Sequence, residues 1–482
     1  MVFSSVFFLF LFLPIALGGY YLVPTVRLKN LWLLLSSLWF YAWGEFRYLP
    51  LLGSSIVLNY GFGLLIAHFD KGSRQRFWSL AVAVAVNLGL LVYFKYWCFL
   101  LGNLSPIFQH LGHPLHIPDI PLPLGISFFT FHALSYLIDV SRGQVEVQRS
   151  PFRLALYISL FPQLVAGPIV RYGHVAHELS ARKLSWEDSA YGVYRFIIGM
   201  AKKVLIANVV GAVADQCFAL PSASVTPAQA TLGAVCYTLQ IYFDFSGYSD
   251  MAIGLGRLFG FHFRENFDLP YWATSLTDFW KRWHISLTSW FRDYLYVPLT
   301  GNQFWVPPWR AYLAMFIVFF LCGFWHGASW TFVAWGMLHG IGLIAERAAV
   351  LKWLGRIPAP LQRLYTLLLV VAGWILFRSD TFGQAANTFG AIASVKGWMA
   401  FRGSELDAVI SAEGWVALLV GMLASTPLPR WLSEHLLVRR GEPGDQGWSA
   451  RPVGTVVLVS LLLLSAMKLA SGSFNPFIYY RF

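Results

Sequence analysis

A histidine lies near the middle of a long charge-free stretch. Residues 311–345 contain no Asp, Glu, Lys or Arg, and His326 follows Trp325 within this stretch. As one helix, the stretch would be about 50 Å long, well beyond the ~30 Å hydrocarbon core of a bilayer. It must therefore break or fold back, and Gly323 and Gly327 are the expected positions. An ionisable ring beside such a break is tolerated where it lines a cavity or meets a partner.

The chemistry available to His326 is proton transfer. A buried neutral imidazole can take a proton near physiological pH, as a general base must. The alternative is a polar side chain that only hydrogen-bonds a neighbouring helix. The adjacent glycines and the excess length of the stretch favour a site. Trp325, which precedes the histidine, is a candidate substrate contact.

A second group of candidate residues is the run Lys281, Arg282, Trp283 and His284. Two cations beside a histidine could bind the phosphates of a cytosolic anionic donor. The alternative is anchoring of the chain at the inner membrane surface. Anchoring accounts for the cations but not for His284, because a neutral histidine contributes little to it.

Acidic and hydroxyl side chains interrupt another apolar segment. Asp244, Tyr248 and Asp250 lie within residues 242–250, around Gly247. Such groups are costly in a membrane unless they face a polar cavity. The carboxylates could act as general acid or base, or orient a histidine. They could equally satisfy backbone groups opened at Gly247, and the sequence does not decide between these roles.

The remaining sequence features give weaker evidence of a functional site. His110, His113 and His116 have a spacing that invites a metal site, but Gly112 and Pro114 disfavour the helix that would align their rings. The four cysteines show no CxxC or zinc spacing, so we infer neither disulfides nor a structural metal. Nucleotide-binding and serine-hydrolase motifs are missing where they would carry meaning. We therefore expect no metal and no tightly bound cofactor.

The composition is that of a multi-pass membrane protein. Only 12% of the 482 residues are charged and 57% are hydrophobic, whereas a soluble domain carries about 25% charged residues. The net charge of +12 resides mainly in short connectors, as orientation by the positive-inside rule requires. No basic patch accompanies a soluble fold, so nucleic-acid binding is not expected.

The hydropathy pattern predicts an all-α polytopic protein with one membrane domain covering 1–482. The N-terminal segment has no basic n-region or small-residue cleavage site and is interpreted as an uncleaved first span. The candidate spans are 3–23, 30–44, 48–68, 77–101, 121–140, 190–218, 229–260, 311–325, 328–345, 361–378, 408–426 and 452–470.

Connector charge sets the predicted orientation. Residues 102–122 and 219–229 contain no Lys or Arg and are placed outside, together with the N-terminus. Residues 141–153 and 171–189 are both basic and both inside, so the segment between them, interrupted by prolines and a glycine, is predicted to be a re-entrant hairpin. Phe279–Tyr296 mixes charged and aromatic residues and is predicted to be one amphipathic helix at the inner interface.

Several longer strings resemble the membrane-bound O-acyltransferase (MBOAT) family, and within it the branch that serves bacterial alginate O-acetylation. The resemblance is nearly complete from residue 1 to about 380 and weak over 381–450. The strings that carry it are Met1–Ser5, Phe40–Gly44, Leu124–Phe128, Ser135–Asp139, Phe161–Pro168, Tyr242–Gly254, Phe279–Leu287, Trp325–Ala328 and Phe477–Phe482.

The resemblance implies a helical fold of about 11–13 spans, with re-entrant and interfacial helices around a central funnel or tunnel. Its core would cover about 121–380, followed by divergent C-terminal spans over 381–482. The near-invariant histidine of the family falls on His326, and the second motif position falls on His284. We expect His326 to act as general base and His284 to position the thioester or donate to its oxyanion.

The resemblance also implies the reaction and its setting. Acetyl groups would pass from a cytosolic thioester, most simply acetyl-CoA, across the bacterial inner membrane to an exopolysaccharide such as alginate. Periplasmic SGNH-hydrolase-like partners and the exopolysaccharide machinery would complete the transfer. The alternatives are a same-fold acyltransferase acting on cellulose, peptidoglycan or D-alanyl groups, and a transporter without chemistry.

Overall fold

The computed structural model describes residues 2–221, 224–301, 303, 306–440, 448–472 and 475. The C-terminal string Phe477–Phe482, one of those that carry the family resemblance, lies outside the described residues. The described chain is almost entirely helical, which confirms the predicted fold class. The exception is a short antiparallel hairpin of β1 (Val438–Arg440) and β2 (Trp448–Ala450), which the sequence pattern did not predict.

The chain packs as two compact units. Unit 1 contains Met1–Gly192 and Ala252–Arg264, and unit 2 contains Val193–Met251 and Glu265–Phe482. Two helices, α10 (Trp186–Ala201) and α12 (Pro227–Leu258), each pass from one unit into the other. The prediction of a single domain over 1–482 stays a prediction.

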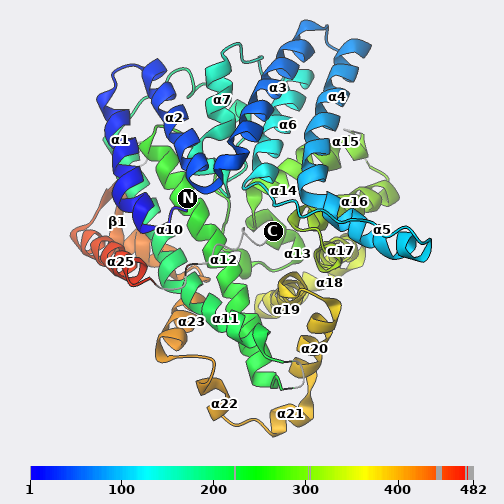
Figure 1. Ribbon diagram of the computed structural model, residues 1–482. Coiled ribbons are helices and arrows are strands. Elements are labelled where there is room, and N and C mark those ends of the chain that lie inside the picture. Colours follow the sequence, from blue (N-terminus) through cyan, green and yellow to red (C-terminus); the bar gives the residue numbers. More distant parts are fainter. Residues whose placement is uncertain are drawn as a thin grey trace. The chain divides into compact units, whose positions relative to one another are not determined.

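Unit 1 is built mainly from α2, α3, α4, α6 and α7. Helices α3, α4 and α6 pack side by side (Figure 1), and α2 packs on α7. Gly125 and Gly143 flank α6 with φ of 75° and 68°, a conformation that suits glycine at helix ends. The helices of this unit are η1 (Phe8–Phe12), α1 (Leu13–Leu22), α2 (Val26–Glu45), η2 (Phe46–Tyr48), α3 (Leu49–His68), α4 (Arg74–Leu91), η3 (Val92–Tyr96), α5 (Trp97–His110), α6 (Ile126–Arg142), α7 (Pro151–Ser159), α8 (Phe161–Leu164) and α9 (Tyr172–Val175).

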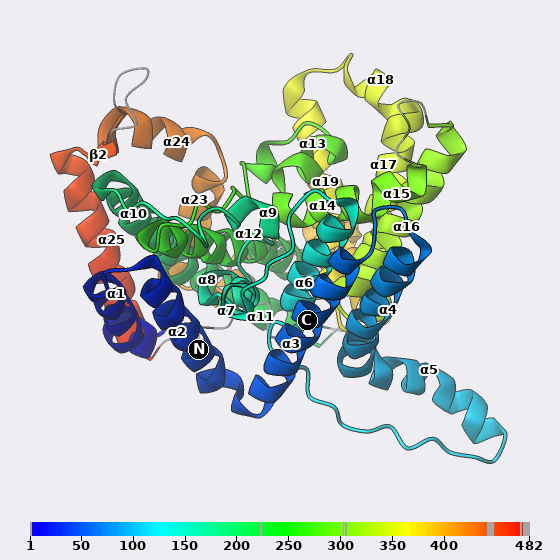
Figure 2. The ribbon, with the colours of Figure 1, turned by 90° about the horizontal axis from the view of Figure 1, so that it is seen from above.

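Unit 2 carries the candidate catalytic and substrate-binding residues predicted from the sequence. Helix α17 packs against both α16 and α19 (Figure 2). Its remaining elements are η4 (Lys202–Ala207), α11 (Asn208–Ala219), η5 (Pro270–Trp272), α13 (Leu276–Arg282), α14 (Ile285–Phe291), η6 (Arg292–Tyr296), α15 (Val297–Thr300), α16 (Pro308–His326), α17 (Trp330–Ala345), η7 (Glu346–Val350), α18 (Leu351–Leu354), α19 (Ala359–Arg378), α20 (Phe382–Ala393), α21 (Val395–Met399), α22 (Ser404–Asp407), α23 (Ala412–Ala424), α24 (Leu428–Leu432), η8 (Ser433–Leu437) and α25 (Pro452–Ala470).

Fewer helices meet a simple spanning test than the sequence pattern predicts. Among the described residues, six helices are long and apolar enough to cross a membrane. The number is seven if the bent pair Ala412–Ala424 and Leu428–Leu436 forms one span. The predicted span at 121–140 fails by length, because α6 has 17 residues. The predicted span at 328–345 lies in a continuous helical run from Trp330 to Leu354, which is not among the six. The predicted spans 30–44 and 48–68 belong to one continuous helical segment, Val26–His68. The chain is nonetheless a multi-pass membrane protein.

The segment between the two basic connectors of unit 1 has the predicted irregular backbone. Helix α7 ends at Ser159, α8 is one turn long, and residues 165–170 form no regular element except a turn. All residues from 156 to 170 are buried. A buried, broken segment fits a re-entrant hairpin, which stays a prediction because it concerns the position of the membrane.

The predicted break in the charge-free stretch is confirmed. Helix α16 ends at His326, Gly327 is extended with φ of −168°, and α17 begins at Trp330. The two helices pack closely through glycines. A Cβ on Gly323 would lie 2.4 Å from the Phe332 carbonyl oxygen, and one on Gly336 would lie 2.3 Å from that of Phe319. Small residues therefore set the close approach that holds His326 in place.

The prediction of one amphipathic interfacial helix over Phe279–Tyr296 is wrong. The chain breaks after α13, and His284 adopts a left-handed conformation with φ of 43° before α14 begins. The aromatic side chains of Trp280, Trp283 and Trp290 are buried in the protein. Tertiary packing of these rings, together with hydrogen bonds to the break itself, outweighs the helical pattern of the sequence.

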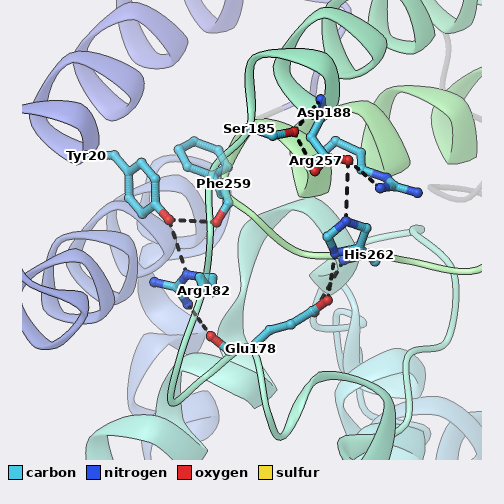
Figure 3. Close-up of polar contacts among 8 residues, drawn as sticks. All are labelled: Tyr20, Glu178, Arg182, Ser185, Asp188, Arg257, Phe259 and His262. Carbon is cyan, nitrogen blue, oxygen red and sulfur yellow. Dashed lines mark hydrogen bonds and ion pairs between the residues drawn. The ribbon is translucent and has the colours of Figure 1, made fainter. Parts of the chain in front are cut away.

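A cluster of charged side chains lies in unit 1 (Figure 3). The Nδ1 atom of His262 is 2.7 Å from the Glu178 carboxylate, and its Nε2 atom is 3.4 Å from Asp188. Asp188 also accepts from Arg257 at 2.5 Å. These contacts join the loop after α9 to the start of α10 and the end of α12. These polar contacts therefore fix the connector 176–188 against the end of α12 and the residues that follow it.

We expect Glu178→Gln to lower the pKa of His262. The hydrogen bond with Glu178 raises that pKa against the opposing effects of burial and Arg257. The stabilisation is present while the imidazole is protonated, below its unfolded pKa of about 6.5, and is lost as the pH rises through the raised folded value. An NMR titration of the His262 ring measures the change. Glu187→Gln removes an exposed carboxylate from the same connector and should leave the titration in place.

Candidate active site

His284 is held at the break between α13 and α14. Helix α13 begins where the buried Glu346 carboxylate accepts from the backbone N–H groups of Leu276 and Thr277 at 2.6 and 2.8 Å. The chain then turns so that the N–H of Ile285 donates to the Asn266 carbonyl at 2.9 Å. Only 1% of His284 is exposed. Burial lowers its pKa to about 3, so the ring is neutral at physiological pH.

His326 is enclosed by aromatic rings from three helices. Its imidazole meets Trp325, Trp335 and Phe377 edge to face, at centroid distances of 4.7, 5.0 and 5.2 Å. It keeps 8% of its surface exposed, whereas His284 keeps 1%. Both residues are therefore buried, and the aromatic packing fixes the orientation of the His326 ring.

Trp325 connects the two histidines. Its ring centroid lies 4.7 Å from that of His326 and 6.4 Å from that of His284. The three side chains come from the end of α16 and the break before α14. The two histidine motifs are therefore neighbours in unit 2, although 42 residues separate them in the sequence. This is the arrangement that two residues acting on one reaction require.

A third histidine, which the sequence analysis did not single out, lies in the same aromatic cluster. His339 on α17 is 5.1 Å from Trp335 between ring centroids, and its Nδ1 atom accepts from the Trp280 indole N–H at 3.4 Å. A Cβ on Gly373 would lie 2.8 Å from its Nε2 atom. A signal was available, because His339 lies in the same charge-free stretch as His326 and is flanked by Gly336 and Gly340.

The acidic residues of α12 lie in ion pairs. Asp244 is 2.5 Å from the Lys203 ammonium, and each side chain is 2% exposed. Asp250 pairs with Arg195 and lies 2.7 Å from Lys202. These ion pairs account for the carboxylates without catalysis. The role of satisfying backbone groups opened at Gly247 is excluded, because α12 runs unbroken through Gly247. The third member of this group, Tyr248, is also on α12 and is buried, with 2% of its surface exposed.

The two cations of α13 differ in their surroundings. Lys281 is exposed. The Arg282 guanidinium donates to the Asp278 carboxylate at 2.8 Å and to the Asp268 carbonyl at 3.3 Å. Arg282 therefore helps to hold the turn that leads to His284, while Lys281 is available to a ligand. The two cations are not equivalent.

An apolar cavity of about 130 Å³ lies between α13–α14 and α16. Its wall includes Leu287, three residues after His284, and Cys322, four residues before His326. Arg292 and Tyr296 also line it. A dry cavity of about 150 Å³ accepts a molecule the size of benzene, so this space suits a thin apolar group, although neither histidine lines it.

No metal centre is formed by the residues that the structure describes, in which no group of three or more His, Cys, Asp or Glu is arranged to hold an ion. His110 ends α5, and His113 and His116 follow in the exposed loop after it.

Comparison with known proteins defines the class. The family model described as the membrane-bound O-acyltransferase family matches residues 144–376. The chain belongs to this family, and it is an O-acyltransferase. It is 40% identical to the probable alginate O-acetylase AlgI of Pseudomonas putida, over the whole of both chains. It is 37% identical to the peptidoglycan O-acetyltransferase of Helicobacter pylori, over 84% of this chain and 81% of that protein. Identity to the teichoic acid D-alanyltransferase of Bacillus subtilis is 31%, over 58% of this chain and 73% of that protein.

Proposed function

We propose that this protein takes acetyl groups from cytosolic acetyl-CoA and passes them across the bacterial inner membrane for O-acetylation of alginate. The observation that carries the proposal is the juxtaposition of His326 and His284 on the Trp325 ring. The full-length similarity to the probable alginate O-acetylase supports acetyl as the group and alginate as the polymer.

In the proposed reaction, His326 removes the proton from an acceptor hydroxyl. The resulting oxygen attacks the acetyl carbonyl, the new C–O bond forms, and the C–S bond breaks. The thiolate leaves as CoA and takes up the proton that His326 holds. A positioned general base contributes about 10²–10⁴-fold. Holding donor and acceptor together contributes further, and exclusion of water limits hydrolysis.

The apolar cavity suits the acyl end of the donor. Its walls lie one helical turn from His284 and one from His326. A thioester with its slender arm fits a space of about 130 Å³, whereas the nucleotide of CoA does not. The nucleotide would therefore stay at the cytosolic surface, where Lys281 is exposed.

The partners follow from the same proposal. Periplasmic SGNH-hydrolase-like proteins would receive the acetyl group and complete its transfer to the polymer, together with the exopolysaccharide machinery. The N-terminus would lie in the periplasm. Reporter fusions at residue 1 and within the connector 176–188 test this orientation, because the two fusions should report opposite sides of the membrane.

The test of the function uses membrane vesicles that contain the full chain together with a periplasmic SGNH-hydrolase-like partner. Acetyl-CoA and alginate are added, thiol release is followed, and the acyl group released from the polymer by mild base is identified. The expected result is polymer-dependent thiol release with acetate as the product. D-alanine in place of acetate would redirect the proposal to the teichoic acid type of reaction. Thiol release only with peptidoglycan fragments would change the acceptor. Solute flux without thiol release would indicate a transporter.

We expect Lys281→Ala combined with Arg282→Ala to raise the KM for acetyl-CoA more than it lowers kcat. Hydrogen bonds to charged groups contribute about 1.5–3 kcal/mol, so loss of one phosphate contact corresponds to at least a tenfold rise in KM. Lys281→Ala alone should give most of the effect, because Arg282 is already paired with Asp278. Steady-state kinetics in the vesicles measure it. Lys352→Ala, at another exposed lysine of unit 2, is the control. An unchanged KM would make both cations membrane anchors.

A further inference from the structure

A buried asparagine contacts the ring of His284. Asn266 is fully buried, and its Oδ1 atom lies 3.1 Å from His284 Nδ1. The same oxygen lies 3.1 Å from the backbone nitrogen of Ser286 and 2.8 Å from the Ser286 hydroxyl. The Asn266 carbonyl also accepts from Ile285 at 2.9 Å. One residue therefore supports both the backbone break and the imidazole.

The orientation of this amide follows from its partners. A backbone N–H can only donate, so the Asn266 atom that faces the Ser286 nitrogen must be the oxygen. At the other end of the amide, Nδ2 donates to the Ser249 hydroxyl of α12 at 3.0 Å. The oxygen and nitrogen of Asn266 are thus assigned by contacts independent of the histidine.

The orientation of the amide sets the proton position on His284. The amide oxygen only accepts hydrogen bonds, so Nδ1 of His284 must carry the proton that it shares with Asn266. A neutral imidazole has one protonated nitrogen, and Nε2 therefore presents a lone pair. Nε2 is buried and makes no hydrogen bond to any other described residue. The lone pair of Nε2 therefore has no donor among the described residues.

We infer that Asn266 is a positioning residue that fixes the tautomer of His284, so that Nε2 accepts a hydrogen bond from an N–H or O–H group of a substrate. The inference rests on the proposed function, in which His284 touches a substrate. It replaces the expectation that His284 donates to an oxyanion, because a neutral ring in this tautomer has no donor at Nε2. The group recognised is an amide N–H of the donor arm or the acceptor hydroxyl.

The tautomer is measured without any reaction. The protein is labelled with ¹⁵N-histidine in lipid nanodiscs, and the ring nitrogens of His284 are assigned by their loss in His284→Gln. The expected result is a protonated Nδ1 and an unprotonated Nε2 in the wild-type protein. The reverse assignment would overturn the inference whatever the activity. With the expected tautomer, full activity of His284→Gln would overturn the contact with substrate but leave the proposal for His326 intact.

The titration arm uses Asn266→Asp. A carboxylate beside His284 favours the charged ring, and opposite charges move a pKa by about 1–3 units. The pKa of the His284 ring, followed with the same ¹⁵N label, should therefore rise by about one unit or more, which a purely structural role would not produce. A folded variant in which this pKa does not rise contradicts the inference. Asn208→Asp, at a buried asparagine of unit 2 whose amide contacts Asn475, should leave the pKa of His284 in place.

The variant Asn266→Ala shows which of two groups Nε2 of His284 binds, an amide N–H of the donor arm or the acceptor hydroxyl. The expected loss is about 10–100-fold in kcat/KM, in line with the loss of one partner that orients an active-site histidine. A rise in KM for acetyl-CoA assigns the hydrogen bond to the donor arm. A rise in KM for the polymer assigns it to the acceptor hydroxyl. Loss of protein abundance without a kinetic change in the protein that remains would overturn the positioning role.

Discussion

Polymer acetylation is expected to be abolished by His326→Ala, with the protein still inserted in the membrane in normal amounts. Loss of the general base alone removes about 10²–10⁴-fold of rate, which places acetylation below detection in cells. The ring lies at the end of α16 among three aromatic side chains, so its removal disturbs packing locally. The measurement is the acetyl content of the secreted polymer, normalised to the amount of membrane protein.

Two further variants separate chemistry from packing at this position. His326→Gln keeps much of the volume and a polar end but cannot act as a base near neutral pH, so it should be as inactive as His326→Ala. His435→Ala, at an exposed histidine of unit 2, should keep wild-type acetylation. Wild-type acetylation in either His326 variant would remove this residue from the mechanism.

The break beside His326 was predictable because it follows from length alone. A charge-free run of 35 residues cannot cross a bilayer once as a straight helix, and glycines mark where it turns. The position of His284 followed only from the family resemblance and from the failure of anchoring to explain a neutral ring. The proximity of the two histidines depends on the packing of Trp325, which no local pattern encodes.

The backbone at His284 could not be predicted from the sequence. Aromatic and charged residues recur over Phe279–Tyr296 with a spacing that suits one amphipathic helix. The structure replaces that helix by two, because the Asn266 side chain and carbonyl bind the N–H groups of Ser286 and Ile285. Asn266 precedes His284 by 18 residues and belongs to none of the sequence motifs named above. A tertiary contact, not a local preference, decides this element.

The same limit applies to the acidic residues of α12. Their sequence context is equally consistent with catalysis and with structure, because an apolar segment does not reveal which charges lie opposite. The partners lie 41 residues earlier for Asp244, at Lys203, and 55 residues earlier for Asp250, at Arg195. Once these pairs are known, the carboxylates are explained by charge neutralisation inside the protein.

Lys203→Met is therefore expected to destabilise the protein by about 3–5 kcal/mol, because it leaves the Asp244 carboxylate buried without its cation. Both side chains are 2% exposed, so water cannot replace the lost partner. The measurement is the midpoint of thermal unfolding in detergent, monitored by size-exclusion chromatography. Arg347→Met, at an exposed arginine of unit 2, is the control and should change the midpoint little.

The double variant Lys203→Met with Asp244→Leu decides the role of Asp244. A buried ion pair replaced by apolar side chains of similar volume is often neutral or stabilising, so the double variant should recover most of the lost stability. If Asp244 is structural, polymer acetylation recovers together with the midpoint of unfolding. A stable but inactive double variant would show that the Lys203–Asp244 pair takes part in the reaction. Stability and polymer acetylation can differ in this variant only if the pair does more than neutralise charge inside the protein.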